Sequence, residues 1–547
     1  MTRTLLLPGP ALALFLLSSF PPPGGARPGP SSPPRRADVL LAGRVLAVDG
    51  SPAAGVPVTA RPLAGGPAVT VFTDEAGRFA VPTVSDGEHA LTARLGGLRS
   101  QADTAKAGDP VAAELRLAAD PAAEAASSAW LSLLPDGAEK RRFVLDCTGC
   151  HQLSGRVALV DGRPRTLEAW VEAIGRMLAF AGPESSFPVI GHGREPAATA
   201  EWLVRALTAA PRPRPETVTG AAREAVITEY DVPDDELPHD LALDAEGRVV
   251  ATGMFRHVMY RLDPRTGRLQ ELPIPVPNAG PRALEIDPDG GWWVLLGNAT
   301  SVARRDPADG SWRTWDIGMY PHSIGRGDDG RIWFNGHFTR DPTLLASLDP
   351  ATGAVDTVPM PDDPEWREGT PIPYELRMGP DGSVWTTELA GNRVLRYSPG
   401  DGSFRTWRMP AEHSGPRRLD VAPDGTVWIP EYSGGKLARL DPSSGEIVEF
   451  DLPTRDALPY VARVDRRRGV VWVAEAGADA VARFDPRSET WLEIPLPARG
   501  TLVRHLDVDH ETGAVWAAYG HAPPLSPKLA RIELREDAVE RDAGGVQ

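Results

Sequence analysis

The chain has 547 residues but only two cysteines, Cys147 and Cys150. So few cysteines exclude a fold held together by several disulfides, and the pair must therefore serve a specific purpose. Positive charge is also scarce, because 58 Lys and Arg face 74 Asp and Glu, for a net charge of −16. A nucleic acid or an anionic membrane as the main partner requires a basic surface, so we expect neither.

Long apolar runs are missing outside the N-terminus. Residues 5–20 are mostly apolar but fall short of the ~20 residues that a membrane-spanning helix needs. Arg3 precedes this run and the small residues 24–26 follow it, as in a signal peptide. We therefore expect residues 1–26 to be a signal peptide of a secreted or periplasmic protein, with no membrane span after cleavage. A retained anchor is the alternative.

Residues 38–119 alternate between apolar and polar positions and contain many turn residues. This pattern predicts short β-strands. The elements G-x-V at 43–45, G-x-P-V at 55–58 and T-D-x-x-G-x-F at 73–79 resemble the carboxypeptidase regulatory-like module. The resemblance implies a small β-sandwich with a structural or adhesive role and no peptidase activity.

Residues 130–210 have a different pattern. Apolar residues recur at helical spacing from Leu167 to Leu178 and again from Ala200 to Leu207. We therefore predict a small α-helical domain around the two cysteines. The proline-rich segment 211–215 is expected to be a stiff linker that leads out of it.

Cys147, Cys150 and His151 form the sequence C-x-x-C-H, the attachment motif of covalent haem c. The two thiols match the two vinyl groups of one porphyrin, and the adjacent imidazole can bind the iron. A zinc site would need more nitrogen or sulfur ligands nearby, and a thioredoxin-like pair would need a βαβ setting. We expect covalent haem c and, with it, a redox partner protein.

The second axial ligand of the iron is less certain from the sequence. Met177 lies at the end of a predicted helix, and its thioether would raise the reduction potential. Met177 could instead fill core space, as methionine often does, and His192 is the next candidate. On its motif, the segment resembles short class I-like cytochromes c.

The rest of the chain is a repeat array. Seven segments open with similar text, at residues 238, 281, 321, 373, 416, 459 and 503. Each has room for four strands in about 43 residues, as in one blade of a β-propeller. The last segment stops after three strands, and the missing strand precedes the first segment at 226–233. We predict a multidomain, mainly β protein whose residues 224–536 form a seven-bladed propeller closed by that strand.

The sequence motifs of these repeats, such as P-H-S-I at 321–324 and V-W-T-T-E at 384–388, resemble those of the streptogramin (virginiamycin B) lyase family. That resemblance implies eliminative opening of a cyclic depsipeptide ester, with a histidine as general base and glutamates that help to hold Mg²⁺. Carried over residue by residue, the histidines are His239 and His322, and the glutamates are Glu388, Glu431 and Glu475.

The two kinds of residue never occur in the same repeat. Gly253 and Gly336 stand at the glutamate position of the repeats that carry His239 and His322, and the last repeat has Arg504 and Tyr519. We expect the polar residues of all blades to converge in a funnel that binds a small molecule or peptide. The members of this expected funnel are His239, His322, Arg282, Arg417, Glu388, Glu431 and Glu475. The alternative is that they are hydrated lining.

Three functions fit these features. The first is an exported c-type haem protein that couples electron transfer to binding at the propeller, as a haem-dependent oxidoreductase or a redox carrier. The second is a lyase-like, Mg²⁺-dependent enzyme with an accessory haem domain. The third is a non-enzymatic binding protein. We prefer the first function, because the expected haem is an electron-transfer group and would have no role in a simple binding protein.

Overall fold

The computed structural model describes residues 40–82, 87–106, 113–120, 125–185, 187–208, 217–363, 371–521 and 527–535. The predicted signal peptide, residues 1–26, lies outside these ranges. All described residues belong to one compact unit. Within them, no helix combines the length and the apolar character needed to cross a membrane.

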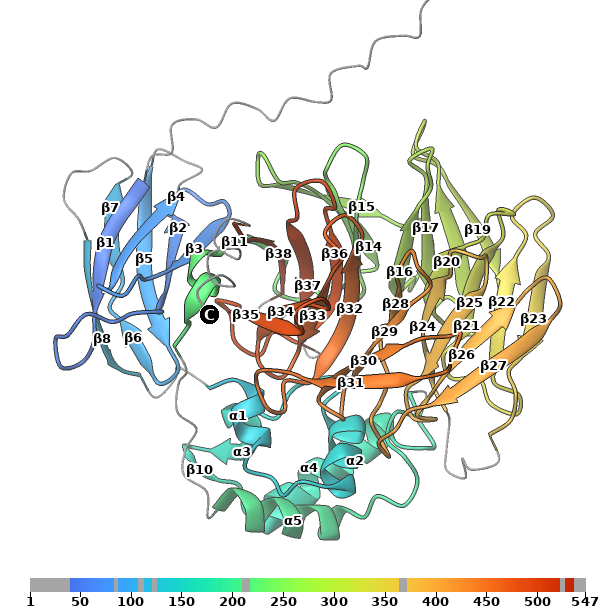
Figure 1. Ribbon diagram of the computed structural model, residues 1–547, viewed down its shortest axis with the longest axis horizontal. Helices are drawn as coiled ribbons and strands as arrows, with labels where there is room; N and C mark the ends of the chain where they lie inside the picture. The colour runs from blue at the N-terminus through green and yellow to red at the C-terminus, as the bar shows by residue number, and fades with distance from the viewer. Residues whose placement is uncertain are drawn as a thin grey trace, which may run out of the picture. The chain divides into compact units, whose positions relative to one another are not determined.

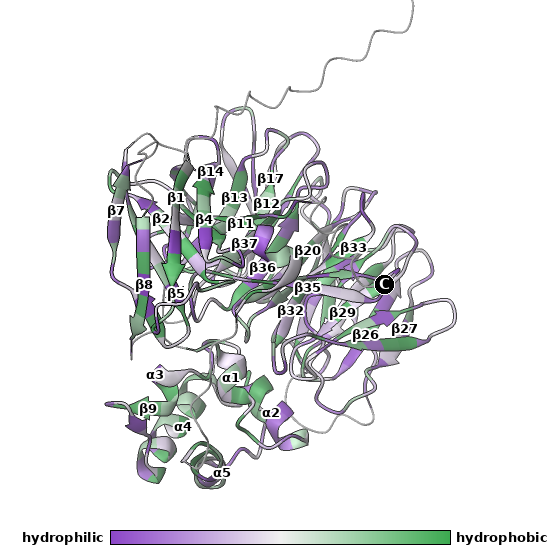
Figure 2. Cartoon of the chain, turned by 60° about the vertical axis from the view of Figure 1, so that its left-hand side comes forward, coloured by the Kyte–Doolittle hydropathy of each residue, from purple (hydrophilic) through white to green (hydrophobic). Residues whose placement is uncertain are grey.

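An N-terminal β-sandwich comes first (Figure 1). Alternating residues point inward, as along β8, where hydrophobic and hydrophilic residues take turns (Figure 2). Val45, Leu91 and Leu115 are buried in its core. The strands are β1 (Leu40–Leu46), β2 (Pro57–Pro62), β3 (Ala68–Phe72), β4 (Arg78–Pro82), β5 (Glu88–Leu95), β6 (Leu98–Ser100), β7 (Asp103–Lys106) and β8 (Ala113–Ala119).

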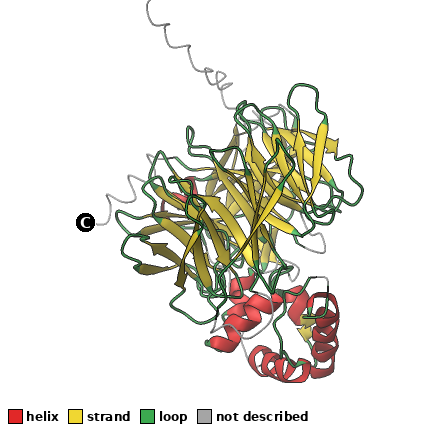
Figure 3. Cartoon of the chain, turned by 90° about the vertical axis from the view of Figure 1, so that its right-hand side faces the viewer, coloured by secondary structure: helices red, strands yellow, loops and turns green. Residues whose placement is uncertain are grey.

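The helices follow the sandwich and gather in one segment (Figure 3). They are α1 (Ser127–Leu131), α2 (Ala138–Cys147), α3 (Gly155–Ala158), α4 (Leu167–Ala181) and α5 (Pro196–Thr208), with a short hairpin of β9 (Leu159–Val160) and β10 (Arg163–Pro164). The hydroxyl of Thr166 caps α4, and Trp170, Ile174 and Leu203 are buried between helices. The predicted helices of this segment are confirmed, whereas its assignment as a cytochrome c domain stays a prediction.

Six four-stranded antiparallel sheets make up most of the remainder. Their strands are β12 (Pro238–Leu243), β13 (Val249–Gly253), β14 (Val258–Asp263) and β15 (Arg268–Pro273); β16 (Pro281–Ile286), β17 (Trp292–Leu296), β18 (Ser301–Arg305) and β19 (Trp312–Asp316); β20 (Pro321–Arg326), β21 (Ile332–Gly336), β22 (Leu344–Leu348) and β23 (Val355–Pro359); β24 (Pro373–Met378), β25 (Val384–Glu388), β26 (Arg393–Ser398) and β27 (Ser403–Arg408); β28 (Asp420–Val421), β29 (Val427–Glu431), β30 (Lys436–Leu440) and β31 (Ile447–Asp451); β32 (Pro459–Asp465), β33 (Val470–Glu475), β34 (Ala480–Asp485) and β35 (Thr490–Pro495). Tryptophans of the second strands, such as Trp385 and Trp428, are buried in the cores between neighbouring sheets.

The strands of the last repeat belong to a larger sheet. The strands β36 (Val503–Val508), β37 (Val515–Tyr519), β38 (Lys528–Glu533) and β11 (Val226–Asp231) form one end of a 12-stranded sheet that continues into the sandwich. The structure therefore shows six separate blade sheets, and a seventh blade stays a prediction because its four strands belong to this larger sheet. The physical reason is that β11 pairs on one edge with β38 and on the other with β3.

The displaced strand pairs as predicted. All six residues of β11 are in register with β38, from Val226 opposite Glu533 to Asp231 opposite Lys528. The inner strand β36 also reaches the first blade, because the backbone N–H of Leu243 donates to Asp507 at 3.0 Å. The N-terminal strand thus completes the last sheet and leaves its edge protected.

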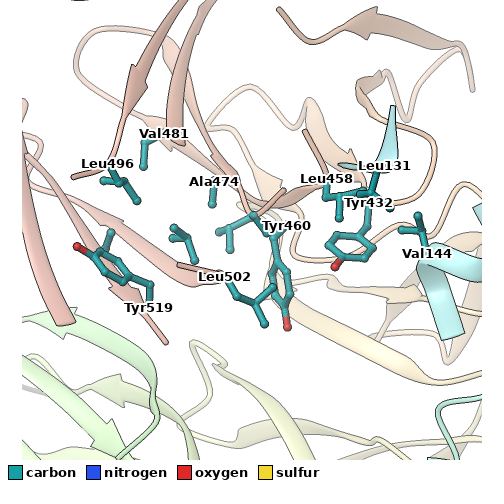
Figure 4. Close-up of a cluster of buried hydrophobic side chains, with 14 of the residues drawn as sticks. Leu131, Val144, Tyr432, Leu458, Tyr460, Ala474, Val481, Leu496, Leu502 and Tyr519 are labelled. Carbon is teal, nitrogen blue, oxygen red and sulfur yellow. The ribbon is translucent and has the colours of Figure 1, made fainter. Parts of the chain in front are cut away.

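The helical domain packs on the propeller through a shared hydrophobic core. Leu131 of α1 and Val144 of α2 belong to the same buried cluster as Tyr432 and Tyr460 of the propeller (Figure 4). At the edge of this core the ammonium of Lys140 pairs with the carboxylate of Asp456 at 2.7 Å. A 3₁₀ turn, η1 (Gly220–Glu224), then leads the chain into β11.

Candidate functional site at the propeller axis

Local irregularities at the start of the inner strands aim side chains out of the blade ladders. The strand β12 pairs with β13 at Pro238 and next at Leu241, with a register shift between them. The same shift follows the first proline of β16, β20, β24 and β32. Proline has no N–H for the ladder, and a bulge re-aims the residue beside it. The residues that follow these prolines are His239, Arg282, His322, Tyr374 and Tyr460.

In the fifth blade Arg418 leaves the ladder of its own sheet, whereas the backbone N–H of Arg417 still donates to the carbonyl of Pro430 in β29 at 3.0 Å. The regular part of β28 is only Asp420–Val421. The backbone N–H of Arg418 donates instead to the carbonyl of Tyr460 in the next blade, at 3.1 Å. Arg417 and Arg418 are both 1% exposed, so their guanidinium groups are held inside the ring.

Three buried histidines meet where these strands converge. The ring centroids of His239 and His322 are 5.5 Å apart, and the rings of His322 and His337 stack at 4.2 Å. Burial, followed by the charge of Arg282, lowers the pKa of His239 to about 3. The pKa values of His322 and His337 are also well below their usual range, mainly through burial. All three imidazoles are therefore neutral at pH 7 and can accept a proton or a hydrogen bond.

A tyrosine cluster encloses Arg417. Its guanidinium carbon lies 3.7 Å from the ring centroid of Tyr432, 4.2 Å from that of Tyr460 and 5.1 Å from that of Tyr374. The hydroxyls of Tyr374 and Tyr460 share a hydrogen bond. Burial alone would raise the pKa of Tyr460, but Arg417 and Arg504 outweigh it and lower that pKa to about 8. The Nε and Nη1 atoms of Arg417 are buried without a hydrogen-bond partner.

The C-x-x-C-H loop lies directly against this cluster. The hydroxyl of Tyr432 donates to the carbonyl of Thr148 at 2.9 Å, and Arg504 donates to the carbonyls of Gly149 at 3.3 Å and Cys150 at 3.2 Å. A Cβ on Gly149 would lie 3.3 Å from Nη2 of Arg417, a tight contact that favours glycine there. The motif and the propeller interior therefore form one site, although these contacts span 284 to 355 residues of sequence.

The motif residues are arranged at the end of a helix. The helix α2 ends at Cys147, and the hydroxyl of Thr148 closes its last turn on the carbonyl of Val144 at 2.7 Å. Cys147 and Cys150 are half-buried, free thiols. Burial lowers the pKa of His151, whose Nδ1 atom is buried without a hydrogen-bond partner. Two free thiols and a neutral imidazole are the groups that covalent haem attachment requires.

The charged side chains next to His239 form ion pairs with one another. Arg418 donates to both carboxylate oxygens of Asp240, at 3.0 and 2.8 Å. Asp240 also contacts Nδ1 of His239 at 2.8 Å, and Arg463 pairs with Glu375 at 3.2 Å. Because Asp240, Arg418 and Glu375 come from three different blades, this buried ion network ties blades together across the ring.

The three glutamates of the predicted funnel are not part of this site. Glu388 pairs with Arg393 of its own blade, Glu431 faces Glu449, and Glu475 faces Glu493. In the described part of the chain, no three His, Cys, Asp or Glu side chains are close enough to hold a metal ion. The expected convergence of these carboxylates is therefore wrong, since each lies at the end of a regular second strand where no bulge re-aims it. Binding of Mg²⁺ stays a prediction.

Two of these carboxyls are held in their neutral form. Burial and the charge of Glu449 raise the pKa of Glu431 to about 8. Burial and Glu493 raise the pKa of Glu475 well above its usual range. A protonated carboxyl avoids the repulsion between two buried negative charges.

A glutamate does occupy the equivalent place in the first blade, but it comes from another position. Glu236 accepts hydrogen bonds from the N–H groups of Leu237 and Phe255, both at 2.8 Å, and from Tyr260 at 3.1 Å. A Cβ at residue 253 would collide with its carboxylate. Gly253 therefore stands there because Glu236 fills the space.

The candidates for the second iron ligand differ in burial. Met177 is 37% exposed on α4, and the side chain of His192 is exposed. His521, which follows β37, is 6% exposed, and its Nε2 atom has no hydrogen-bond partner. Its pKa is lowered to about 3, by burial first and then by the charges of Arg504 and His151. Of these three, His521 is the one that is buried.

Three residues of the site were missed from the sequence: His337, Arg418 and His521. His337 directly follows the glutamate position of its repeat, which was assigned to Gly336. Arg418 follows Arg417, and two adjacent arginines at the start of an inner strand could have signalled long-range ion pairs. His521 lies outside the repeat pattern, and no sequence signal identifies it.

The comparisons with known proteins agree with this architecture. Residues 367–533 match the virginiamycin B lyase family, and residues 41–118 match the carboxypeptidase regulatory-like domain. Among solved structures, virginiamycin B lyase from Staphylococcus aureus is 22% identical with a TM-score of 0.50, over 57% of this chain and 100% of that one. A streptogramin B lyase is 22% identical with a TM-score of 0.52, over 58% of this chain and 100% of that one. No curated protein matches the chain.

The chain contains a carboxypeptidase regulatory-like β-sandwich, followed later in the sequence by a lyase-like β-propeller. At 22% identity the solved lyases establish the fold of the propeller and nothing about its chemistry. In the last blade of the lyase-like propeller, Arg504 holds the C-x-x-C-H loop, and Tyr519 bonds to Glu229 of β11. The histidine and glutamate positions of the last repeat are therefore occupied by residues with structural partners.

Proposed function

We propose that this protein is an exported c-type haem protein whose lyase-like propeller binds a small molecule or partner segment beside the haem. One observation carries the proposal: the C-x-x-C-H loop is docked on the interior of the propeller by Tyr432 and Arg504. A haem attached there would lie next to the tyrosine and histidine clusters. Electron transfer to or from a bound ligand would then need no large movement of the two domains.

The attachment residues fit the haem. Cys147 and Cys150 are both free, and His151 is neutral with one ring nitrogen unpaired. Once bound, haem c supplies reversible one-electron chemistry. The protein holds its attachment loop in place through the carbonyls of Thr148, Gly149 and Cys150, which leaves the motif side chains free for the cofactor.

The charges beside the loop favour a ligand with an anionic group. Arg417 and Arg504 are buried, keep unpaired Nε atoms and have no carboxylate partner among the described residues. A buried charge without a partner is costly, so an anion such as a carboxylate would stabilise this region on binding. Tyr460 adds a hydroxyl that can donate to the same group.

We further infer that β36, β37, β38 and β11 act as a seventh blade. The strand β36 contacts β32 on one side and β12 on the other, as an inner strand of a closed ring would. Export is proposed from the signal-like residues 1–26 and the two cysteines reserved for the motif. Haem attachment outside the cytoplasm would fit that location.

The test is expression of the full-length chain in a host with and without the cytochrome c maturation machinery. We expect a coloured protein with one covalent haem only in the first host, and haem that remains attached after acid–acetone extraction. Cys147→Ala and Cys150→Ala should lose or weaken attachment, while the matched control Ser132→Ala, in a helical turn away from the motif, should keep it. A colourless wild-type protein from the competent host would refute the proposal.

A lyase-like enzyme is the second candidate, and the histidine cluster is the observation that favours it. His239 and His322 are neutral and adjacent, and each can accept a hydrogen bond from a bound substrate. The probe is a streptogramin B depsipeptide with Mg²⁺, followed by mass spectrometry of ring opening. His322→Ala should abolish any turnover, whereas Glu431→Gln, outside the site, should not. Absence of turnover by the wild-type protein would leave binding as the role of the axis.

A further inference from the structure

His521 is a buried histidine that no hydrogen bond explains. It follows Gly520 just beyond β37, is 6% exposed, and has a buried Nε2 atom with no partner. Buried polar groups in folded proteins nearly always have partners, so an orphaned imidazole nitrogen indicates a missing ligand or ion. A histidine nitrogen with a free lone pair is the commonest metal-binding group in proteins.

The fold brings His521 to the haem-attachment loop. Val503 of β36 pairs with Tyr519 of β37, so the start of one strand lies beside the end of the other. Arg504, the next residue of β36, holds the carbonyls of Gly149 and Cys150. His521 follows Tyr519 by two residues, so it lies at the same end of this strand pair as Val503.

The two candidates inside the helical domain are placed less well. Met177 is 37% exposed, and the buried face of α4 is formed by Trp170, Ile174 and Ala181 instead. His192 is exposed and lies by a small pocket with Arg142 and His413, outside the tyrosine cluster. Neither has the combination of burial and a free lone pair next to the motif that His521 has.

We propose that His521 is the second axial ligand of the haem carried by Cys147 and Cys150, opposite His151. The inference rests on the proposed haem function. It means that the propeller supplies one iron ligand and the helical domain the other. Two imidazoles hold the haem at a lower potential than an imidazole and a thioether would. The haem would then also link the two domains.

The experiment uses the full-length haem protein and the visible, near-infrared and electron paramagnetic resonance spectra of the oxidised form. Wild type should be low-spin, with the signature of two imidazoles and without the sulfur-to-iron charge-transfer band of thioether ligation. His521→Ala should become high-spin or bind water, and added imidazole should restore the wild-type spectrum. The matched variants Met177→Ala and His192→Ala should keep the wild-type spectrum.

His521→Met covers the case in which His521→Ala does not accumulate. It should remain low-spin but gain the thioether band and a higher potential. A low-spin wild-type spectrum that persists unchanged in His521→Ala or His521→Met, or that is lost in Met177→Ala, would overturn the assignment. Haem content, measured separately as the pyridine adduct, tests the proposed function: absent haem refutes both, whereas attached haem with an insensitive spectrum refutes only the ligand.

Discussion

Two sets of polar residues repeat from blade to blade, and their side chains lie in different places: one set leaves its own blade and the other does not. Residues that follow the opening prolines of the inner strands, such as His322 and Tyr374, leave the ladder at a bulge and contact each other between neighbouring blades. Glutamates at the ends of second strands, such as Glu431 and Glu475, stay in regular ladders and remain in their own blades. The repeat position alone does not determine whether a side chain reaches the axis, since the local backbone geometry decides it.

The two sets also differ in how buried charge is treated. At the axis, Asp240 is ionised and bonded to Arg418, and its pKa is well below its usual range: burial opposes ionisation, but Arg418 outweighs it. At the ends of the second strands, Glu431 faces Glu449 and has a pKa of about 8. A charge with a partner from another blade ties the ring together, whereas a carboxyl that faces another carboxyl is kept neutral. The predictions below test this difference.

The largest effect should come from the axis. Asp240→Ala leaves Arg418 buried without its bidentate partner, and we expect a loss of about 3 to 5 kcal/mol in the free energy of unfolding. Denaturant unfolding followed by tryptophan fluorescence measures it. The control is Asp381→Ala, which removes a half-exposed partner of Arg396 and should cost less than about 1 kcal/mol. Similar losses for both variants would show that the axial pair does not hold the blades.

Glu431→Gln should have a smaller effect with a characteristic pH dependence. The folded-state pKa of about 8 exceeds the ordinary value of 4.5, so this carboxyl contributes stability below pH 4.5 that is lost as the pH rises to 8. The amide cannot ionise, so the variant should be more stable than wild type at pH 8, by roughly 1 to 3 kcal/mol. Unfolding curves at pH 5 and pH 8 measure this. A pH-independent difference between the two proteins would contradict the raised pKa.

Tyr432→Phe should have a modest effect confined to the contact between the domains. It removes the hydrogen bond to the carbonyl of Thr148 and the one from Gln152, but keeps the ring over Arg417. We expect a loss of about 1 kcal/mol and faster proteolysis near the C-x-x-C-H loop. Limited proteolysis with mass spectrometry locates the cuts. Tyr397→Phe, whose hydroxyl has no role in this contact, should be cut at the wild-type rate.

The smallest effect is expected at the surface. Arg176→Ala removes an exposed helical ion pair with Glu172, and the melting temperature should stay within about 1 °C of wild type. Differential scanning fluorimetry is sufficient for this comparison. A shift as large as that of Tyr432→Phe would mean that exposed charges contribute as much as the domain contact.

The sequence predicted the parts of the fold that repeat or alternate. Strand positions, the displaced strand at 226–233 and the helical segment all follow from periodicity, which burial imposes locally. The sequence also predicted that His239, His322 and Arg417 lie together. Each of them follows the proline that opens its repeat, and this position faces the ring interior. The sequence could not predict where the side chains of Glu388, Glu431 and Glu475 point, because that depends on the register in which their strands pair.

Contacts between segments far apart in the chain could not be predicted from the sequence either. The docking of Thr148 on Tyr432 spans 284 residues, and neither residue belongs to a pattern that marks the other. The fusion of the last blade with the sandwich depends on three residue pairs between β11 and β3. Such contacts arise from the shapes of finished domains, so a local pattern cannot reveal them.

The strand β11 has a consequence for how this protein can associate. A ring closed by a terminal strand is open to exchange, because the strand of one copy can complete the ring of another. Here the same strand is bonded on its outer edge to β3, with Arg61 of the sandwich paired to Asp231 at 2.6 Å. Exchange between copies would have to break both ladders and carry the whole sandwich across. The sandwich therefore acts as a lock against strand exchange, and the chain should stay monomeric during refolding at concentrations where an isolated propeller would interlink.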